Sequence, residues 1–376
     1  MKVVVTGAKG FLGKNLGTAL RRRGVEVAEV DLETRPDEVL AAVSGATVLF
    51  HLAGINRPDH EAEFLTGNVG SLESQLAALD RLRATDRPSV LPKIVLASST
   101  QAEQDNSYGR SKLAAEHALE AYSARTETSA VIYRLPGVFG KWCRPNYNSV
   151  VATFCYNIAR DLPVAISDPE KIVQLVHVDD VVAQFMAQTE GHEVGVKLDE
   201  VRPTFTISLG DLVELIRGCR VTRKSLAVAD TTDPFICRLL GTYTSYLPPG
   251  DLAYSLDQRT DVRGTLAEML KSPHFGQLFV SRTKPGFTRG NHYHDRKVEK
   301  FCVVEGKAAI RFRSILAAEV TEYIVSGTDF TIVDIPPGMT HSIENVGSTE
   351  MIVLFWASEI LDTQYPDTHY AEVLCG

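Results

Sequence analysis

A tyrosine and a lysine stand four residues apart, as Tyr108 and Lys112, at the start of the stretch YGRSKLAAEHALEAY. On a helix this spacing places both side chains on one face. A phenol has an ordinary pKa near ~10 and is a poor acid at neutral pH, but a neighbouring ammonium favours its phenolate and eases proton transfer to or from a carbonyl oxygen. An exposed aromatic beside a helix lysine has the same spacing, so the surroundings of the pair decide its meaning.

A cluster of hydroxyl residues precedes this pair, where the apolar run KIVLASST ends in Ser98, Ser99 and Thr100. A hydroxyl at a strand end can bind the oxygen of a substrate carbonyl beside the tyrosine. We select Ser99, which lies nine residues before Tyr108. Ser99, Tyr108 and Lys112 are therefore the predicted catalytic residues of a carbonyl reduction.

Three glycines follow the first apolar run in the motif GAKGFLG, at Gly7, Gly10 and Gly13. Between a strand and a helix, this spacing lets the backbone approach a pyrophosphate, whose charge lies at the helix N-terminus. The motif thus predicts a dinucleotide site. Its further predicted contacts come from the same loop and from the strand end HLAG: Lys9, Phe11, Leu12, Leu52, Ala53 and Gly54.

The identity of the nicotinamide cofactor depends on the end of the second predicted strand, where Asp31 stands. An acidic side chain there can bind the adenosine ribose and favours NAD, whereas Arg35 and Lys9 can contact the 2′-phosphate of NADP. These residues leave NAD and NADP both open.

A second chemical cluster lies far along the chain, in the segments GNHYHDRKVEKF and PPGMTHSIEN. His292 and His294 are two residues apart, so on a strand they face the same side. Glu299 and His341 on neighbouring strands would complete a site of three imidazoles and one carboxylate. Such ligands suit zinc, iron, manganese, nickel or copper, so the residues predict a divalent metal without naming it.

Two kinds of element must position these groups. Up to about Thr244, apolar runs such as KVVVT, EVAEVD, TVLFHLAG, KIVLASS and SAVIYRL alternate with helical stretches, which predicts a doubly wound parallel sheet. Later runs such as GQLFVSRT and MIVLFWAS predict an all-β barrel or jelly roll. We expect a reductase domain over 1–244, a linker over 245–258 and a metal-binding domain over 259–376.

Composition limits the partners and the location of the protein. A net charge of −8 argues against nucleic acid as the main partner, and the absence of a long apolar run argues against membrane insertion. We expect a cytoplasmic protein. The widely spaced cysteines then predict reduced thiols rather than disulfides or a thiolate metal site: Cys143, Cys155, Cys219, Cys237, Cys302 and Cys375.

The first 244 residues resemble the extended short-chain dehydrogenases, many of which act on nucleotide sugars. The resemblance is carried by GAKGFLG, the SST cluster, YGRSK and VHVDDVV. It implies that Ser99, Tyr108 and Lys112 are catalytic and that YRLPGVFG lies beside the nicotinamide. It also implies candidate contacts for the diphosphate of a sugar nucleotide: Arg134, Lys141, Arg144 and Asn148.

The C-terminal part resembles the cupins, since both cupin motifs are present around the four predicted ligands. The long gap between Gly327 and Pro336 departs from the pattern. Just before this region, TDVRGTLAEML resembles a stretch of the deoxysugar 3,5-epimerases and implies that Arg263 contacts substrate.

The whole chain, including FGKWCRPNYNSVVATFCYNIAR, resembles the CapF-type family of bifunctional enzymes of capsule and O-antigen synthesis. That resemblance implies a UDP-2-acetamido-2,6-dideoxy-4-keto-hexose as substrate, C3 epimerisation by a zinc cupin, and NADPH-dependent C4 reduction. It also implies a homodimer on the route to N-acetyl-L-fucosamine.

The order of the two steps follows from chemistry. The proton next to a 4-keto group is acidic because the enolate delocalises onto oxygen, and reduction at C4 removes that acidity. The cupin must therefore act first. Two alternatives remain: a single-activity 4-ketoreductase whose cupin serves dimerisation, and a non-catalytic sensor of redox state and sugar. The proton donor and acceptor in the cupin are not assigned, although Tyr293, Lys297 and Lys300 lie nearby in sequence.

Overall fold

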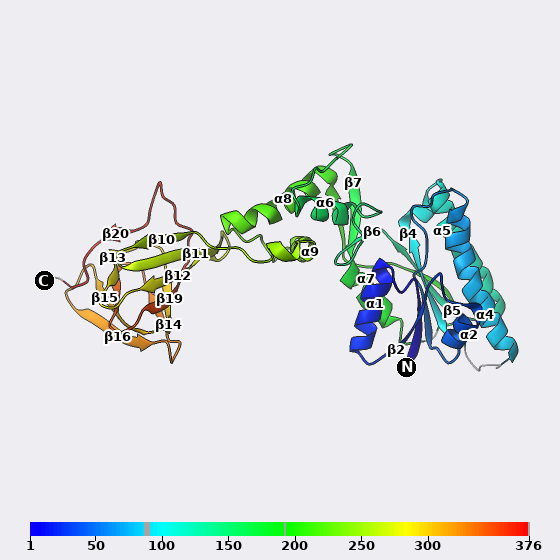
Figure 1. The fold of residues 1–376 in the computed structure, drawn as a ribbon, viewed down its shortest axis with the longest axis horizontal. Coiled ribbons are helices and arrows are strands. Elements are labelled where there is room, and N and C mark those ends of the chain that lie inside the picture. The colour runs from blue at the N-terminus through cyan, green and yellow to red at the C-terminus, as the bar shows by residue number, and fades with distance from the viewer. Residues whose placement is uncertain (86–90, 192, 375–376) are drawn as a thin grey trace. The chain divides into compact units, whose positions relative to one another are not determined.

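The computed structural model describes residues 1–85, 91–191 and 193–374 (Figure 1). Its backbone contacts divide the chain into two compact units. The first comprises Met1–Arg217 with Pro234–Pro248, and the second comprises Gly218–Asp233 with Pro249–Gly376. The chain thus enters the second unit twice, which the predicted boundaries at 244 and 258 did not anticipate.

A six-stranded parallel sheet with the order β2-β1-β3-β4-β5-β8 forms the centre of the first unit. Every apolar run that predicted a strand here forms one, so the predicted doubly wound sheet is confirmed. The strands are β1 (Lys2–Thr6), β2 (Glu26–Val30), β3 (Val48–His51), β4 (Lys93–Ser99), β5 (Ser129–Leu135) and β8 (Gly195–Asp199).

Helices cover both faces of this sheet, because successive strand residues point to opposite sides. On β1, Val3 and Val5 belong to one buried cluster, whereas Val4 belongs to another. The first cluster includes residues of α1 (Phe11–Arg22) and α7 (Val178–Ala187). The second includes residues of α2 (Pro36–Val43), α4 (Ser71–Thr85) and α5 (Ser107–Thr126).

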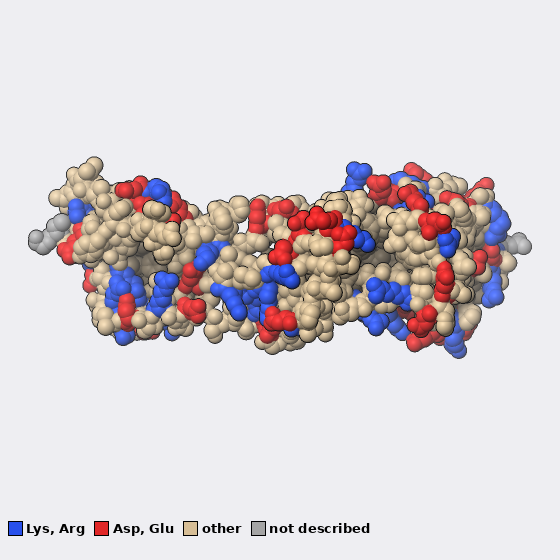
Figure 2. Space-filling model, turned by 90° about the horizontal axis from the view of Figure 1, so that it is seen from above, with Lys and Arg blue, Asp and Glu red and all other residues tan. Residues whose placement is uncertain are grey.

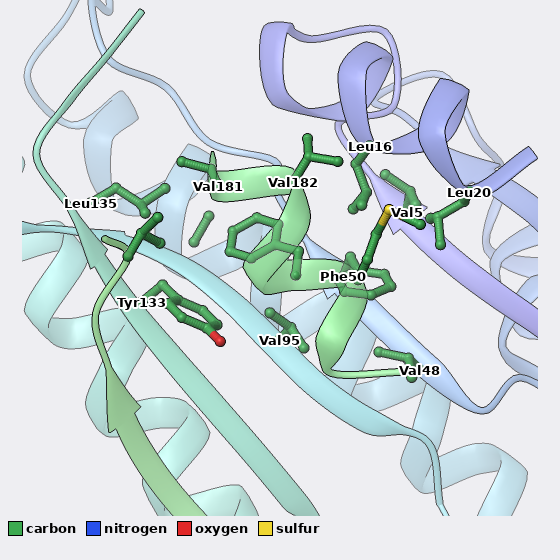
Figure 3. Packing of buried hydrophobic residues seen from close by; sticks show 14 of the residues in the cluster. Val5, Leu16, Leu20, Val48, Phe50, Val95, Tyr133, Leu135, Val181 and Val182 are labelled. Atoms are coloured by element: carbon green, nitrogen blue, oxygen red, sulfur yellow. The ribbon is translucent and has the colours of Figure 1, made fainter. Parts of the chain in front are cut away.

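Figure 3 shows the first of these clusters from close by. Leu16 and Leu20 of α1, Phe50 of β3, and Val181 and Val182 of α7 all belong to this cluster, and all five are buried. Burying such side chains stabilises the fold by about 1.5–3 kcal/mol each. This core fixes the sheet edge where the glycine loop, the β3 end and the β4 end meet.

The first unit also contains a small sheet of β6 (Gly137–Phe139), β7 (Ile172–His177) and β9 (Thr204–Ser208). Ser208 caps the next helix, since its hydroxyl accepts a hydrogen bond from the Asp211 N–H at 3.0 Å, as its sequence suggested. The helices that accompany this small sheet in the chain are α6 (Val150–Ile158), α8 (Leu209–Ser225) and α9 (Pro234–Ser245). Three short elements precede α4 and α5, namely α3 (Glu63–Leu65), η1 (Thr66–Gly70) and η2 (Thr100–Glu103).

The second unit consists of two antiparallel sheets with the orders β10-β11-β12-β19-β14-β17 and β16-β15-β18-β13-β20. This confirms the predicted all-β fold of the C-terminal part. Its elements are η3 (Pro249–Asp251), β10 (Gln258–Asp261), β11 (Gly264–Ser272), β12 (Gly276–Thr283), β13 (Thr288–Tyr293), β14 (Glu299–Glu305), β15 (Lys307–Ser314), β16 (Val320–Ser326), β17 (Ile332–Ile335), β18 (Met339–Asn345), β19 (Met351–Ala357) and β20 (His369–Tyr370).

The segment that precedes α9 joins this unit through its backbone. The Val228 N–H donates to the Lys271 carbonyl, and the Lys271 N–H donates to the Leu226 carbonyl, both at 2.8 Å. These bonds extend the edge of β11 with residues that lie more than forty positions away in sequence. No hydrophobic pattern marks such a pairing.

Charges of both signs lie interspersed on the face drawn in Figure 2, in keeping with the modest net charge of −8. Within the described ranges, no helix combines the length and the apolar character needed to cross a membrane. None of the five described cysteines is in a disulfide, and Cys375 lies outside the described residues.

Candidate functional site

The end of β4 and the start of α5 bring the predicted catalytic residues together. Asn106 caps α5 by accepting a hydrogen bond from the Gly109 N–H at 2.8 Å, which places Tyr108 and Lys112 in its first turns. The Ser99 side chain lies close enough to the Tyr108 hydroxyl to lower the pKa of that phenol. The Lys112 Nζ lies 5.9 Å from the centre of the Tyr108 ring. The neighbouring Ser98 instead binds the Glu116 carboxylate at 2.5 Å, which supports the selection of Ser99.

Burial controls the protonation of this group. It raises the pKa of Tyr108, and the Ser99 side chain only partly opposes that shift. Burial also lowers the pKa of Lys112 to about 8, against the opposing charge of Glu116. A neighbouring ammonium was expected to favour the phenolate, but burial has the larger effect on the pKa of Tyr108 in this structure. A protonated phenol is the form that can donate a proton to a ketone oxygen during reduction.

Asn68, a residue that sequence reasoning missed, binds Ser111 of the helix that carries Tyr108 and Lys112. Its amide accepts from the Ile55 N–H at 3.0 Å and donates to Ser111 Oγ at 3.0 Å. A Cβ on Gly54 would lie 2.6 Å from the Asn68 Oδ1 and 3.2 Å from the Lys112 Nζ, so only glycine fits there. The one sequence signal for Asn68 is its place in the tract GNVG.

The glycine loop has the close packing that its motif predicts. Gly7 has a positive φ of 64°, and a Cβ there would lie 2.9 Å from the Ala53 backbone. A Cβ on Gly13 would lie 2.2 Å from the Gly7 carbonyl oxygen. Gly10 is the N-cap of α1 and offers no side-chain cap, so the first N–H groups of the helix are free to bind an anion. Phe11 and Leu12 open this helix, and the Leu52 and Ala53 N–H groups are held by Thr6 Oγ1 at 3.2 Å.

The predicted substrate residues of the first unit differ in their surroundings. The Arg134 guanidinium forms ion pairs with Glu116 and Glu103, both at 2.7 Å, so it is already engaged inside the fold. Lys141 pairs with Asp179 at 2.5 Å. Arg144 stacks on Tyr147 at 5.1 Å from the ring centre and is exposed, as is Asn148. Of the four, Arg144 and Asn148 are the ones whose side chains are open to a ligand.

The four predicted metal ligands converge between the two sheets of the second unit. His292 on β13 pairs in register with His341 on β18, and Glu299 comes from β14 in the facing sheet. Together with His294, they place their ligand atoms within 4.8 Å of one another. The Glu299 Oε2 lies 3.2 Å from the His341 Nε2 and 3.4 Å from the His294 Nε2.

The hydrogen bonds of the histidines fit a metal site. The Nδ1 of His294 bonds to the Asp367 carbonyl, and that of His341 to the Met339 carbonyl at 3.2 Å. A carbonyl can only accept, so each Nδ1 carries the proton and each Nε2 presents its lone pair. Both Nε2 atoms are buried and have no hydrogen-bond partner among the described residues. A divalent cation would satisfy both of these lone pairs.

The pKa shifts of Glu299 and His292 also fit a metal site. Burial tends to raise the pKa of Glu299, but the His294 and His341 side chains beside it outweigh burial and keep that pKa below its usual range. Burial lowers the pKa of His292 to about 4, so its ring is neutral at physiological pH. A carboxylate with neutral imidazoles is the protonation state that a divalent metal requires.

Asp367 orients this cluster from outside it. Its carbonyl holds His294, while its carboxylate accepts hydrogen bonds from the Asp295, Arg296 and Lys297 N–H groups at 2.8, 3.1 and 2.9 Å. Burial opposes ionisation, but these backbone bonds lower the pKa of Asp367 to about 2. Sequence reasoning missed Asp367 because it lies seventy residues beyond the segment that it supports.

A cavity of about 290 Å³ opens onto the four predicted metal ligands, of which His292 and Glu299 line it. Arg263 lines it, as the sequence suggested, and so does Arg289, which sequence reasoning missed. The buried Arg289 Nη2 has no hydrogen-bond partner among the described residues, although Arg289 Nε donates to Thr283 at 3.0 Å. The rest of the lining is mainly apolar: Leu266, Phe279, Gly290, His292, Glu299, Phe301, Ile343 and Phe355.

None of the three residues considered for proton transfer in this domain lines the cavity. Lys300 forms an ion pair with Asp334 on the outside of β14, and the Tyr293 ring packs against His369. The Lys297 Nζ lies 3.5 Å from Thr368 Oγ1. These positions give no support to any of them as a proton donor or acceptor at the metal cluster.

Comparison with known proteins gives matches to both units. A family model described as the NAD dependent epimerase/dehydratase family matches residues 3–197, and one described as the polysaccharide biosynthesis C-terminal domain matches residues 259–369. A relative from Pseudomonas aeruginosa, named UDP-2-acetamido-2,6-beta-L-arabino-hexul-4-ose reductase, is 41% identical over 99% of each chain.

Solved structures agree with these matches. The crystal structure of the capsular polysaccharide assembling protein CapF from Staphylococcus aureus is 44% identical and has a TM-score of 0.91, covering 99% of this chain and 100% of that one. A structure of MoeE5 in complex with UDP-glucuronic acid and NAD is 25% identical, with a TM-score of 0.51, over 58% of this chain and 82% of that one. The family resemblance inferred from the motifs is confirmed.

Proposed function

The chain belongs to the NAD dependent epimerase/dehydratase family, and we propose that it is a bifunctional nucleotide-sugar enzyme. It epimerises C3 of a UDP-2-acetamido-2,6-dideoxy-4-keto-hexose in the metal-binding domain and then reduces C4 at Ser99, Tyr108 and Lys112. The name of the Pseudomonas aeruginosa relative supports a substrate of this class, and the product would enter capsule or O-antigen synthesis on the route to N-acetyl-L-fucosamine.

The observation that carries the proposal is the cavity of the second unit. It joins the cluster of His292 and Glu299 to two guanidinium groups, Arg263 and Arg289, inside mainly apolar walls. The arginines suit the diphosphate of a nucleotide sugar, since a guanidinium binds phosphate through paired hydrogen bonds. The Arg289 Nη2 makes no hydrogen bond within the described residues and has only a 3.9 Å ion pair with Asp261, so it keeps the capacity to bind such a group.

Each site then has one chemical task. A divalent metal bound by the four ligands, with zinc as our proposal, supplies positive charge that favours the loss of a proton next to the 4-keto group. Arg263 and Arg289 hold the substrate so that C3 faces the cluster. In the first unit a reduced nicotinamide supplies hydride to C4, Tyr108 donates a proton to the C4 oxygen, and Ser99 orients that oxygen.

The epimerisation step is tested with full-length protein in heavy water and no nicotinamide. NMR of the 4-keto sugar should show loss of the C3 proton signal with metal-loaded protein. Glu299→Gln should lower both metal content and exchange, because it removes the one charged ligand. The matched control is Lys300→Gln, the next residue on β14, whose side chain pairs with Asp334 and should leave exchange unchanged. Normal exchange in a metal-free Glu299→Gln protein would remove the cluster from the reaction.

We propose that the protein acts as a homodimer, as its resemblance implies. Light scattering of the purified full-length chain measures this directly. A mass near twice 41.2 kDa is expected, and a mass of one chain over the working concentration range would refute the dimer.

A further inference from the structure

The residues around the adenosine side of the glycine loop bear on which nicotinamide the reductase site accepts. The β2 strand ends directly before Asp31, and the Gly7 N–H donates to the Val30 carbonyl at 2.9 Å, so the strand end and the loop lie side by side. The Asp31 carboxylate accepts a hydrogen bond from the Lys9 N–H at 3.1 Å. In dinucleotide-binding folds this place receives the adenosine ribose.

A short turn holds Asp31 at that place. Its own N–H donates to Thr34 Oγ1 at 2.9 Å, and the Thr34 N–H donates back to the Asp31 carbonyl at 3.0 Å. The carboxylate is half-buried, which limits its screening by water. Asp31 is therefore a fixed negative charge at the ribose and not a mobile surface group.

The two cations that could accept a 2′-phosphate already have acidic partners. The Lys9 Nζ pairs with Glu33 at 3.1 Å, and Arg35 pairs with Glu38 at 2.9 Å and with Asp37 at 3.5 Å. The Arg35 backbone N–H also donates to Glu38 at 3.0 Å, which ties this residue to the start of α2. Exposed ion pairs of this kind contribute little, so either cation could still turn to a phosphate. The choice between NADH and NADPH therefore depends on Asp31.

We propose that Asp31 makes the reductase site select NADH over NADPH. Its carboxylate accepts a hydrogen bond from the ribose 2′-hydroxyl of NADH. A 2′-phosphate, with a charge of about −2, would instead meet this carboxylate at close range. The inference deepens the proposed reductase function, on which it rests, and it reverses the NADPH preference that the family resemblance implied.

The test measures binding directly, with no sugar substrate present. Dissociation constants of NADH and NADPH for the full-length protein are obtained by titration calorimetry and by the change in nicotinamide fluorescence. We expect NADH to bind at least about tenfold tighter, which corresponds to about 1.4 kcal/mol. Asp31→Asn should bring the two constants within about threefold of each other, mainly by strengthening NADPH binding.

Glu33→Gln is the matched control, because it removes a nearby charge that points to Lys9 rather than to the ribose. It should change the ratio of the two constants by less than about threefold. The thermal unfolding midpoints of both variants show whether the fold is kept, and Asp31→Ser gives a second variant should Asp31→Asn unfold.

The outcomes separate this inference from the function beneath it. Tighter binding of NADPH to the wild-type protein, or an unchanged ratio in folded Asp31→Asn and Asp31→Ser, would overturn the role of Asp31 while leaving a nicotinamide-dependent reductase intact. If neither cofactor bound, the reductase assignment itself would fall.

Discussion

Desolvation has the largest effect on the pKa values of the two residues, Tyr108 and Lys112, that we propose for the reduction. Tyr108 keeps its proton because burial raises its pKa, and Lys112 loses part of its basicity because burial lowers its pKa to about 8. The phenol is thus held as an acid next to Ser99, ready to protonate an oxygen that gains charge during hydride transfer.

Replacing Tyr108 by phenylalanine removes that acid while it keeps the ring. We expect Tyr108→Phe to lower kcat for cofactor oxidation by about 10²–10⁴-fold, the usual contribution of general acid catalysis. Proton exchange at C3 without nicotinamide should stay at the wild-type level, since it takes place in the other unit. Stopped-flow absorbance of the nicotinamide measures cofactor oxidation, and NMR measures proton exchange at C3. Full reductase activity in the variant would exclude Tyr108 from the mechanism.

Lys112 predicts a pH dependence. Its pKa falls from the ordinary 10.5 to about 8, so the folded protein releases this proton while the unfolded chain still holds it. The unfolded chain therefore binds more protons between about pH 8 and 10.5, and this group makes the folded state more stable as the pH rises through that window. We propose that the ammonium form of Lys112 binds the nicotinamide ribose, so reductase activity should fall as the pH rises through that window.

A pH profile of kcat/KM, which reports groups of the free enzyme, checks this. Reductase activity should fall above a pKa of about 8. In Lys112→Arg, which stays charged, any activity that remains should lack that decline. A wild-type profile that stays flat to pH 10 would contradict the assigned role.

Short-range patterns account for the site residues that the sequence could predict. Tyr108 and Lys112 share a helix face, and His292 lies near the end of β13 with His294 directly after the strand, so a short sequence spacing brings each pair together. The sequence could not predict the roles of Arg289, Asp367 and Asn68, because these roles depend on segments far away in sequence. The direction of the pKa shift of Tyr108 could not be predicted either, since burial is a property of the whole fold.

At the scale of the elements, the strand ends do most of the positioning. The glycine loop follows β1, the HLAG stretch follows β3 and Ser99 ends β4, so three adjacent parallel strands bring their residues to one edge of the sheet. The alternation of apolar runs and helical stretches was enough to predict this arrangement. It could not predict that Leu226 and Val228 pair with Lys271 of β11, because that pairing needs no periodic pattern.

The glycine loop offers a test within one helix. Gly13→Ala places a methyl group 2.2 Å from the Gly7 carbonyl, so the loop must shift, and we expect cofactor binding to weaken by roughly tenfold or more. Gly17→Ala, one turn later in α1, meets only the flexible end of Arg21 at 3.3 Å and serves as the control. Calorimetric titration with NADH compares them, and equal affinities would mean that the loop does not need its close packing.

At the scale of the whole molecule, the proposed function gives a reason why the two units share a chain, since both steps would act on one ketone. In that proposal the four predicted metal ligands and the two arginines act first, while the C3 proton is acidic, and the tyrosine site then reduces the ketone and makes the new configuration permanent. Domain order along the chain is the reverse of this reaction order. The boundaries that we predicted at 244 and 258 stay a prediction.

The most direct measurement follows the fate of C3 and C4 in one reaction. Full-length, metal-loaded protein is incubated in heavy water with the UDP-4-keto sugar and a reduced nicotinamide, and the product is analysed by NMR. We predict a product with deuterium at C3, inverted configuration at C3 and a new hydroxyl at C4. A product reduced at C4 that retains the original proton and configuration at C3 would contradict the account and leave a single-activity ketoreductase.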